Sequence, residues 1–440
     1  MEDVFVVQGG KKLTGEIYLS GAKNVALKMI IASLLFDEKV ILKNIPRIKD
    51  VSELIHLINL LGVKIKFIEK NTLEIDPTSL KNNQVDFLHG SKIRVSFMLF
   101  APLLYRFGSC LIPNPGGCRI GARPIDRIIE GMRALGISVD YDSNTGYYQA
   151  KMTQKPKGYF RFNKPTHTGT ELLIMLSVFG DNEIILENCA NEPEIDDLIN
   201  FLNQSGAKIE KNQRQIKITG VEKLKFKKPY QIITDRNEAV TYVTMVLATG
   251  GIVTLKNPKI NQLEAFIHHL KQAGGEVIEK DSQLIFKSVK RLNSTNIETE
   301  PHPGFMTDWQ PNWAVLMTQA QGTSTIVERV FENRFSYVEE LKKLGAKIKF
   351  VDFQVSNPQD YYFFNYQKEK VYQQKIEIIG PTELHNGVLN VNDLRAGASL
   401  VVAALIASGE SIINGASVIE RGYEDFVEKI TSLGGVIKKV

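Results

Sequence analysis

One pattern recurs six times along the chain, and its first copy is Leu57-Ile58-Asn59-Leu60-Leu61-Gly62-Val63-Lys64-Ile65. In each copy an amphipathic helix ends in a small or apolar residue, a glycine follows, and a strand begins directly afterwards. Glycine adopts the left-handed conformation that ends many helices without steric penalty, so we expect each of these glycines to be a helix C-cap. The copies are 57–65, 132–139, 202–209, 270–277, 341–348 and 430–437.

The copies lie about 70 residues apart, which indicates a repeated structural unit. Only the last gap is clearly longer, because residues 352–370 form an inserted, aromatic-rich hairpin or loop. A second helix of the unit is apolar around most of its circumference, which is typical of a buried helix. The clearest examples are 26–32, 171–176, 239–246 and 396–402. We therefore predict an α/β fold made of six helix-strand units.

The length of 440 residues is too great for one ordinary core, so we expect two domains of three units each. The N-terminal strand, 4–19, has no partner helix of its own, and we expect it to complete the C-terminal domain. The chain then crosses between domains twice, near 19–23 and near 229–235. The predicted domains are 23–232 and 1–22 plus 233–440, with a small-molecule site in the crevice between them.

Composition excludes several classes of protein. Hydrophobic residues make up 43% and charged residues 23%, as in a globular protein. The net charge of +5 suits anionic ligands, but no basic run is interleaved with aromatic residues, so we expect no nucleic-acid partner. The N-terminus lacks the features of a signal peptide, and the apolar runs are too short to span a membrane. Three cysteines without metal-type spacing fit a reducing cytoplasm, with Cys110 and Cys189 in the core.

The third cysteine lies in the loop Asn114-Pro115-Gly116-Gly117-Cys118-Arg119-Ile120-Gly121-Ala122-Arg123-Pro124-Ile125-Asp126. A strand at 110–112 precedes this loop, and a helix is expected to start near Ile125. The Pro-Gly-Gly turn indicates an exposed tip. Cationic neighbours such as Arg119 and Arg123 favour the thiolate and prepare Cys118 for proton transfer or covalent chemistry. The alternative is a surface loop with an incidental cysteine.

Five further motifs run in order almost from end to end of the chain: Ser20-Gly21-Ala22-Lys23-Asn24, Thr307-Asp308-Trp309-Gln310, Phe331-Glu332-Asn333-Arg334-Phe335, Asp393-Leu394-Arg395-Ala396 and Arg421-Gly422-Tyr423-Glu424. With the loop, they resemble the motifs of the UDP-N-acetylglucosamine enolpyruvyl transferases. This resemblance implies a two-domain inside-out α/β barrel, each domain having three units with sheets outside and helices inside. It also implies transfer of the enolpyruvyl group of phosphoenolpyruvate to the sugar 3-hydroxyl of UDP-N-acetylglucosamine, with no metal or organic cofactor.

The resemblance assigns a role to each residue of the reaction centre. Cys118 is the general acid, which in the family can form an adduct with phosphoenolpyruvate and is labelled by the epoxide fosfomycin. Asp308 takes the proton of the sugar hydroxyl, and the alternative is a helix N-cap at Thr307 or Asp308. Asp393 holds the site together. The residues that bind the carboxylate and phosphate are Lys23, Arg123, Arg395 and Arg421; the alternative for the arginines is a structural ion pair, such as Arg395 with Asp393.

The residues expected to contact the sugar nucleotide follow from the same resemblance. In two places the chain departs from the family pattern: His167 and Thr168 stand where valine and glycine are usual, and Arg127 replaces an apolar residue. These departures lie at residues expected to recognise the diphosphate and the uracil. The expected contacts are Asn24, Arg94, Arg123, Pro124, Ile125, Asp126, Arg127, Lys164, Pro165, Thr166, His167 and Val330.

Two other functions are compatible with parts of this pattern. An enolpyruvyl transferase can use another acceptor, either shikimate 3-phosphate or a nucleotide of secondary metabolism. The shikimate branch lacks the loop cysteine, so Cys118 argues against it, whereas the departures at the nucleotide contacts leave the second acceptor open. A non-catalytic paralogue that binds UDP-sugars is disfavoured, because Lys23, Cys118 and Asp308 are all present.

Overall fold

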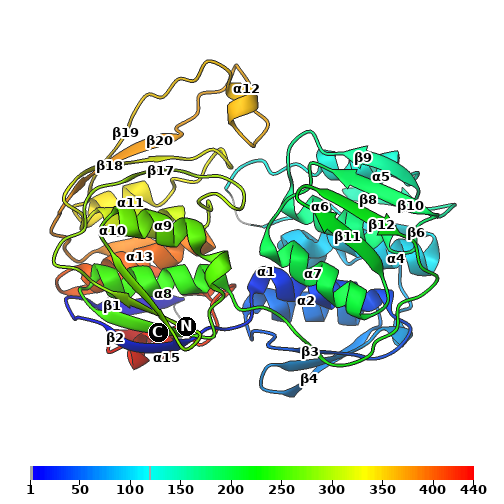
Figure 1. The fold of residues 1–440 in the computed structure, drawn as a ribbon, viewed down its shortest axis with the longest axis horizontal. Coiled ribbons are helices and arrows are strands. Elements are labelled where there is room, and N and C mark those ends of the chain that lie inside the picture. Colours follow the sequence, from blue (N-terminus) through cyan, green and yellow to red (C-terminus); the bar gives the residue numbers. More distant parts are fainter. Residues whose placement is uncertain (1–2, 118–119) are drawn as a thin grey trace. The chain divides into compact units, whose positions relative to one another are not determined.

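The computed structural model describes residues 3–117 and 120–440, which form two compact units. We call residues 21–117 and 124–233 the N-terminal unit, and residues 3–20, 120–123 and 234–440 the C-terminal unit. Each unit is built around its own large cluster of buried apolar side chains. Figure 1 shows both as mixtures of helices and strands, which confirms the predicted α/β class.

The helices and strands of the N-terminal unit alternate along the chain. Its longer helices are α1 (Lys23–Ala32), α2 (Lys49–Leu60), α3 (Phe87–Lys92), α4 (Phe100–Phe107), α5 (Asp126–Ala134), α6 (His167–Ser177) and α7 (Pro193–Gln204). Its strands are β3 (Val40–Lys43), β4 (Lys64–Glu69), β5 (Thr72–Asp76), β6 (Ser109–Pro113), β7 (Ser138–Asp142), β8 (Tyr147–Lys151), β9 (Gly158–Arg161), β10 (Glu183–Glu187), β11 (Lys208–Asn212), β12 (Gln215–Thr219) and β13 (Tyr230–Gln231).

The C-terminal unit repeats this alternation. Its helices are α8 (Arg236–Ala248), α9 (Glu264–Gln272), α10 (Gln310–Met317), α11 (Val338–Lys343), α12 (Pro358–Tyr361), α13 (Leu394–Ile406), α14 (Ala416–Ile419) and α15 (Phe426–Ser432). Its strands are β1 (Val4–Gln8), β2 (Thr14–Tyr18), β14 (Ile252–Lys256), β15 (Glu276–Lys280), β16 (Gln283–Lys287), β17 (Asn296–Glu298), β18 (Gly322–Val327), β19 (Lys347–Phe350), β20 (Lys375–Gly380), β21 (Val388–Asn390), β22 (Glu410–Asn414) and β23 (Val436–Lys439).

Five of the six sheets of the described residues share one strand order. Five have four strands, with one parallel pair at an edge followed by two antiparallel pairs: β13-β3-β5-β4, β9-β10-β12-β11, β2-β14-β16-β15, β17-β18-β20-β19 and β21-β22-β1-β23. The sixth, β6-β8-β7, is antiparallel, and Gln84 forms a parallel bridge to Leu111 where the other sheets have their fourth strand. None of these sheets closes into a barrel.

The two helix predictions are confirmed. The six glycines that follow the amphipathic helices have φ between +85° and +101°, the left-handed region expected of a C-cap (Gly62, Gly136, Gly206, Gly274, Gly345 and Gly434). The apolar helices α1, α6, α8 and α13 are buried along almost their whole length. In the C-terminal unit, α8, α10 and α13 lie side by side, with the sheets towards its outside (Figure 1).

The N-terminal segment completes two sheets of the C-terminal unit, as the sequence predicts. It forms two strands rather than one. Strand β1 lies between β22 and β23, with Val4 opposite Asn414 and Phe5 opposite both Ile413 and Lys439. Strand β2 pairs in parallel with β14.

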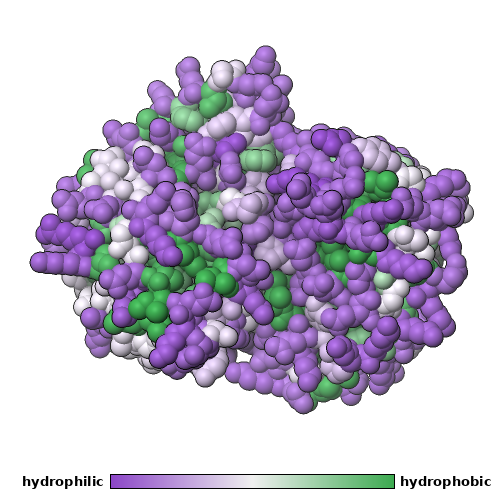
Figure 2. Space-filling model, viewed as in Figure 1, coloured by the Kyte–Doolittle hydropathy of each residue, from purple (hydrophilic) through white to green (hydrophobic). Residues whose placement is uncertain are grey.

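The insertion between β19 and β20 contains the short helix α12 and stacked rings, including Tyr362 on Phe364 with centroids 4.8 Å apart. On the face shown in Figure 2, hydrophilic residues predominate and hydrophobic ones are scattered in small groups. No helix of the described residues is long and apolar enough to cross a membrane.

Candidate active site

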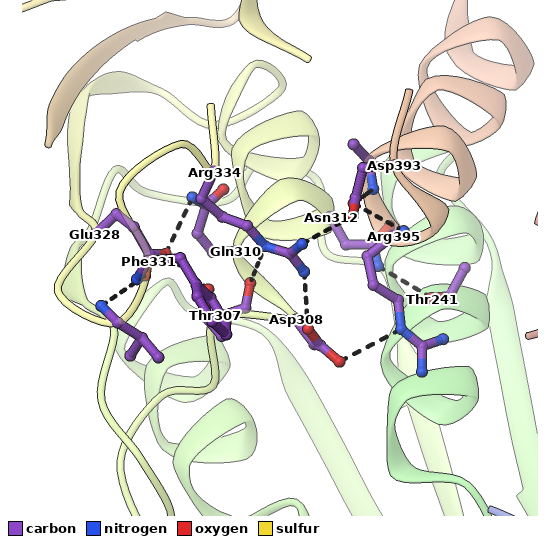
Figure 3. Close-up of polar contacts among 12 residues, drawn as sticks. Thr241, Thr307, Asp308, Gln310, Asn312, Glu328, Phe331, Arg334, Asp393 and Arg395 are labelled. Atoms are coloured by element: carbon purple, nitrogen blue, oxygen red, sulfur yellow. Dashed lines mark hydrogen bonds and ion pairs between the residues drawn. The ribbon is translucent and has the colours of Figure 1, made fainter. Parts of the chain in front are cut away.

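Asp308 lies between β17 and α10 of the C-terminal unit, where its carboxylate contacts two arginines (Figure 3). Nη2 of Arg334 donates a hydrogen bond to Oδ1 at 2.7 Å, and Nε of Arg395 lies 3.5 Å from Oδ2. The Asp308 side chain is 22% exposed, so a ligand can reach it. The N-cap alternative is wrong, because Trp309 occupies the N-cap of α10, and its side chain makes no capping hydrogen bond. Asp308 is therefore held by side chains rather than by a helix start.

Arg334 joins the Asp308 segment to helix α13. Its Nη1 donates to Oδ2 of Asp393 at 2.9 Å, on the other branch of the guanidinium from the bond to Asp308. Oδ1 of Asp393 accepts the backbone N–H groups of Arg395 and Ala396 at 3.0 and 2.9 Å, which caps α13. The predicted alternative, an ion pair between the Arg395 and Asp393 side chains, is thus replaced by pairs of Asp393 with Arg334 and of Arg395 with Asp308.

The guanidinium of Arg395 is buried, with its Cζ 5.2 Å from the ring centre of Tyr423. Burial alone would lower the pKa of Arg395, but Tyr423, Asp235 and Asp308 more than offset it and raise that pKa above its ordinary value. Its Nη1 is buried and has no hydrogen-bond partner among the described residues. A buried charged donor left in this state is costly unless a ligand accepts from it. Arg395 is therefore suited to bind an anion.

A buried carboxylate, Glu328, links two neighbouring segments of the C-terminal unit. Its Oε1 accepts the backbone N–H groups of Val330 and Phe331 at 2.8 and 3.0 Å, and its Oε2 accepts the Thr307 hydroxyl at 2.9 Å (Figure 3). Burial raises the pKa of Glu328, although these hydrogen bonds oppose the shift. Glu328 thus ties Val330, an expected nucleotide contact, to the segment that carries Asp308.

The expected general acid, Cys118, lies outside the described residues, as does Arg119. Pro115, just before them, is buried. A Cβ on Gly116 would lie 1.8 Å from the carbonyl oxygen of Ser91, so only glycine fits this close approach. The Pro-Gly start of the loop is therefore packed against the chain, which corrects the expectation of an exposed tip at these two residues.

The later part of the loop belongs to the C-terminal unit. The backbone N–H of Asn333 donates to the carbonyl of Ile120 at 3.2 Å. The guanidinium of Arg123 lies 5.5 Å from the ring centre of Phe331. These contacts place Arg123 next to the segment that Glu328 organises. Arg421, which follows α14, is half-buried.

Lys23 and Asn24 are the first two residues of α1 in the N-terminal unit. Nζ of Lys23 lies 2.7 Å from Oδ2 of Asp50, and both side chains are largely buried. Arg94 begins a short 3-10 helix (Arg94–Leu99) and lies 5.7 Å from the ring centre of Phe97. Helix starts carry partial positive charge, so both locations favour anions.

The segment 164–167 leads into α6. Thr166 is at the N-cap position but its side chain bonds to no N–H there, and His167 is the first helical residue. Nε2 of His167 lies 3.4 Å from Oε1 of Glu171, which is fully buried and pairs with Lys28 at 3.0 Å. Lys164 and Pro165 are half-buried. The departure at His167 is therefore accompanied by a buried row of charges that joins α6 to α1.

The segment 124–127 leads into α5, which begins at Asp126 close to the predicted position. Pro124 and Asp126 are exposed, Arg127 is half-buried and Ile125 is buried. The other two cysteines are core residues as predicted: burial raises the pKa of Cys110, and it raises the pKa of Cys189 to about 12.

Comparison with known proteins decides the family. The chain matches the family model described as EPSP synthase (3-phosphoshikimate 1-carboxyvinyltransferase) over residues 7–430. The chain belongs to the enolpyruvyl transferase family. Curated relatives from Idiomarina loihiensis and Koribacter versatilis are 36% and 37% identical and cover all of this chain and 99% and 96% of their own lengths. One from Clostridium acetobutylicum is 38% identical, with 99% of each chain covered. All three are named UDP-N-acetylglucosamine 1-carboxyvinyltransferase, the last with the number 2.

Solved structures of other enolpyruvyl transferases share the fold of this one. NikO from Streptomyces tendae has a TM-score of 0.86 at 20% identity and covers all of this chain and 99% of its own. An EPSP synthase from Acinetobacter baumannii has a TM-score of 0.74 at 17% identity, with both chains fully covered. At these identities the likeness establishes the fold alone.

Several residues that organise this enolpyruvyl transferase had no role assigned from the sequence. Arg334 was visible only as part of the motif 331–335, and neither Glu328 nor Asp50 was expected. The sequence does indicate that Lys28 and Glu171 are unusual, because each is a charged residue within a stretch that is otherwise apolar and buried. A charge in such a stretch needs a buried partner.

The His167–Glu171 pair predicts a pH-dependent contribution to stability. Burial opposes the charged imidazole, but the Glu171 carboxylate more than offsets it and raises the pKa of His167. The pair therefore stabilises the fold fully below the unfolded pKa of about 6.5 and loses this effect as pH rises through the folded pKa. We expect His167→Gln to lower the free energy of unfolding by about 1 kcal/mol near pH 5.5 and by less near pH 8.5.

Urea unfolding of both proteins at the two pH values measures this difference. His268→Gln, at an exposed position of α9, is the control and is expected to show the same small change at both. An equal loss in His167→Gln at the two pH values would show that the imidazole stays neutral in the fold.

Proposed function

We propose that this enolpyruvyl transferase moves the enolpyruvyl group of phosphoenolpyruvate to the 3-hydroxyl of UDP-N-acetylglucosamine and releases phosphate. The reaction is an addition and elimination through a tetrahedral intermediate, and it is the first committed step of peptidoglycan precursor synthesis. The names of the relatives support this acceptor. The observation that carries the chemistry is the buried Nη1 of Arg395, which has no hydrogen-bond partner in the described part of the chain, beside the reachable carboxylate of Asp308.

The proposed roles follow from what each step requires. Cys118 protonates the methylene carbon of phosphoenolpyruvate, which makes the adjacent carbon electrophilic. Asp308 accepts the proton of the sugar hydroxyl as it attacks. Planar guanidinium groups and an ammonium bind the carboxylate and phosphate and stabilise the charge that develops as phosphate leaves; we assign this to Lys23, Arg123, Arg395 and Arg421. No metal or organic cofactor is required by these steps.

We assign recognition of the sugar nucleotide to the two helix starts and the loop segments described above. Asn24 and Arg94 lie at helix starts, where partial positive charge favours a diphosphate. The remaining proposed contacts are Arg123, Pro124, Ile125, Asp126, Arg127, Lys164, Pro165, Thr166, His167 and Val330. Of these, Arg127 and His167 are the ones that give this chain a recognition surface different from the usual family pattern.

A second candidate acceptor is another nucleotide. The pair of His167 with the buried Glu171, at a proposed diphosphate contact, is the observation that favours it. Phosphate release that is as fast as or faster than with UDP-N-acetylglucosamine, in the presence of a nucleotide that lacks N-acetylglucosamine, would identify that nucleotide as the acceptor.

The finer architecture is also a proposal. The common strand order of the sheets supports six helix-strand units, arranged as two inside-out barrels of three, with domains 23–232 and 1–22 plus 233–440. We place the reaction in the cytoplasm, where free thiols such as those of Cys110 and Cys189 remain reduced.

The purified protein is expected to release phosphate from phosphoenolpyruvate only when UDP-N-acetylglucosamine is present, without added metal. A coupled phosphate assay with each substrate alone and with both measures this directly. The mass of the product, UDP-N-acetylglucosamine bearing an enolpyruvyl ether, is the confirming observation. Turnover with a different acceptor and none with UDP-N-acetylglucosamine would overturn the proposed function.

A further inference from the structure

We infer that Arg334 is a positioning residue of the transfer reaction, which fixes the carboxylate of Asp308 relative to Arg395 without touching either substrate. The inference rests on the proposed function, because it takes Asp308 as the group that accepts the hydroxyl proton. It adds a residue for which the sequence predicted no role.

Every branch of the Arg334 guanidinium has a partner within the protein. Nη2 donates to Asp308 at 2.7 Å, Nη1 donates to Asp393 at 2.9 Å, and Nε lies 3.5 Å from the carbonyl oxygen of Thr307 (Figure 3). The side chain is 2% exposed. Because the N–H donors of this planar guanidinium already have protein acceptors, it orients the two carboxylates around it and is poorly placed to bind a substrate anion.

Arg395 contacts the same carboxylate but has the opposite character. Its Nε lies beside Oδ2 of Asp308, while its Nη1 is buried with no protein acceptor among the described residues. One arginine thus has a donor left for an anion and the other holds the carboxylate. Of the two guanidinium groups at Asp308, that of Arg395 therefore binds the anion, and that of Arg334 positions the carboxylate.

The contacts of Arg334 close a ring. Asp308 pairs with Arg334, Arg334 pairs with Asp393, and Asp393 accepts the backbone N–H of Arg395, whose side chain returns to Asp308. Because Asp393 also caps α13, the ring is fixed to a buried helix. This ring sets the distance between the proposed base and the proposed anion-binding arginine.

Lysine cannot replace Arg334 in this ring. A single ammonium lacks the fork that reaches Asp308 and Asp393 from two branches, so Arg334→Lys retains the charge but releases one carboxylate. Misplacement of a reacting group by about 1 Å lowers turnover about 100-fold. We expect Arg334→Lys to lower kcat by about this factor and to change the KM for phosphoenolpyruvate less than about threefold.

A double-mutant cycle with Asp308→Asn tests whether Arg334 acts through Asp308. If it does, the kcat of the double variant Asp308→Asn/Arg334→Lys is expected to lie within about threefold of the kcat of Asp308→Asn alone. The carboxylate that Arg334 positions is absent from both of these variants. Arg334→Gln is the second variant, and thermal unfolding shows which variants fold. A double variant that is slower than Asp308→Asn by the full factor seen for Arg334→Lys would overturn the inference.

The remaining outcomes are also decisive. Failure of both Arg334 variants to fold would make Arg334 a purely structural residue and would also overturn the inference. Absence of turnover in the unmodified protein with UDP-N-acetylglucosamine would instead overturn the proposed function itself. Normal turnover in that protein with independent effects in the cycle rejects the role of Arg334 and leaves the proposed function intact.

Discussion

A Cys118→Ala variant is expected to release phosphate at least about 100-fold more slowly than the unmodified protein, because no acid remains to protonate the methylene carbon. Cys118→Asp keeps a proton donor but offers no sulfur nucleophile. We therefore expect it to retain part of the turnover and to lose covalent labelling by fosfomycin. Phosphate release and mass spectrometry of fosfomycin-treated protein measure the two properties separately.

Cys189→Ala is the matched control for this prediction. Cys189 is fully buried, with a pKa raised to about 12, so its thiol is expected neither to react nor to contribute to turnover. An adduct mapped to Cys110 or Cys189, or full activity in Cys118→Ala, would contradict the assignment of the loop thiol as the reactive acid.

Arg395→Lys is expected to lower kcat/KM by about 100- to 1,000-fold, the loss typical of removing a preorganised donor to developing charge. The ammonium of lysine lacks the planar fork, so it cannot both remain beside Asp308 and direct a second donor to the anion. Steady-state kinetics with phosphoenolpyruvate as the varied substrate measure the effect.

Arg329→Lys is a closely matched control. Arg329 contacts the carboxylates of Glu298 and Glu300 and, like Arg395, lies over a tyrosine ring, with its Cζ 4.2 Å from the centre of Tyr361, yet it has no part in the proposed site. We expect its kcat/KM to stay within about twofold of the unmodified protein. An equal loss in both variants would show that the effect of Arg395→Lys comes from general damage to the C-terminal unit.

Local patterns predicted the framework because their causes are local. A glycine after an amphipathic helix specifies a left-handed cap wherever the helix lies, and all six have the expected φ. In the same way, a helix that is apolar around most of its circumference needs burial, and α8 and α13 are buried.

The partners of the site residues could not be predicted in this way. Asp308 pairs with a residue 26 positions away and Arg334 with one 59 positions away, and no periodicity specifies such pairs. Sequence proximity instead offers two alternatives for these residues: a helix N-cap at Thr307 or Asp308, and Asp393 as the partner of the Arg395 side chain. Both were wrong, because buried charges choose partners by tertiary geometry.

The position of β1 has a consequence for how the protein is made. This strand is synthesised before the other described strands, but both of its neighbours, β22 and β23, come from the segment 410–439. The backbone N–H and C=O groups of β1 therefore lack their strand partners until nearly the whole chain has been translated. The strands of the N-terminal unit can pair before that point. Ribosome-bound chains that end before residue 410 are expected to hold a protease-resistant N-terminal unit next to a C-terminal unit that is still open to cleavage.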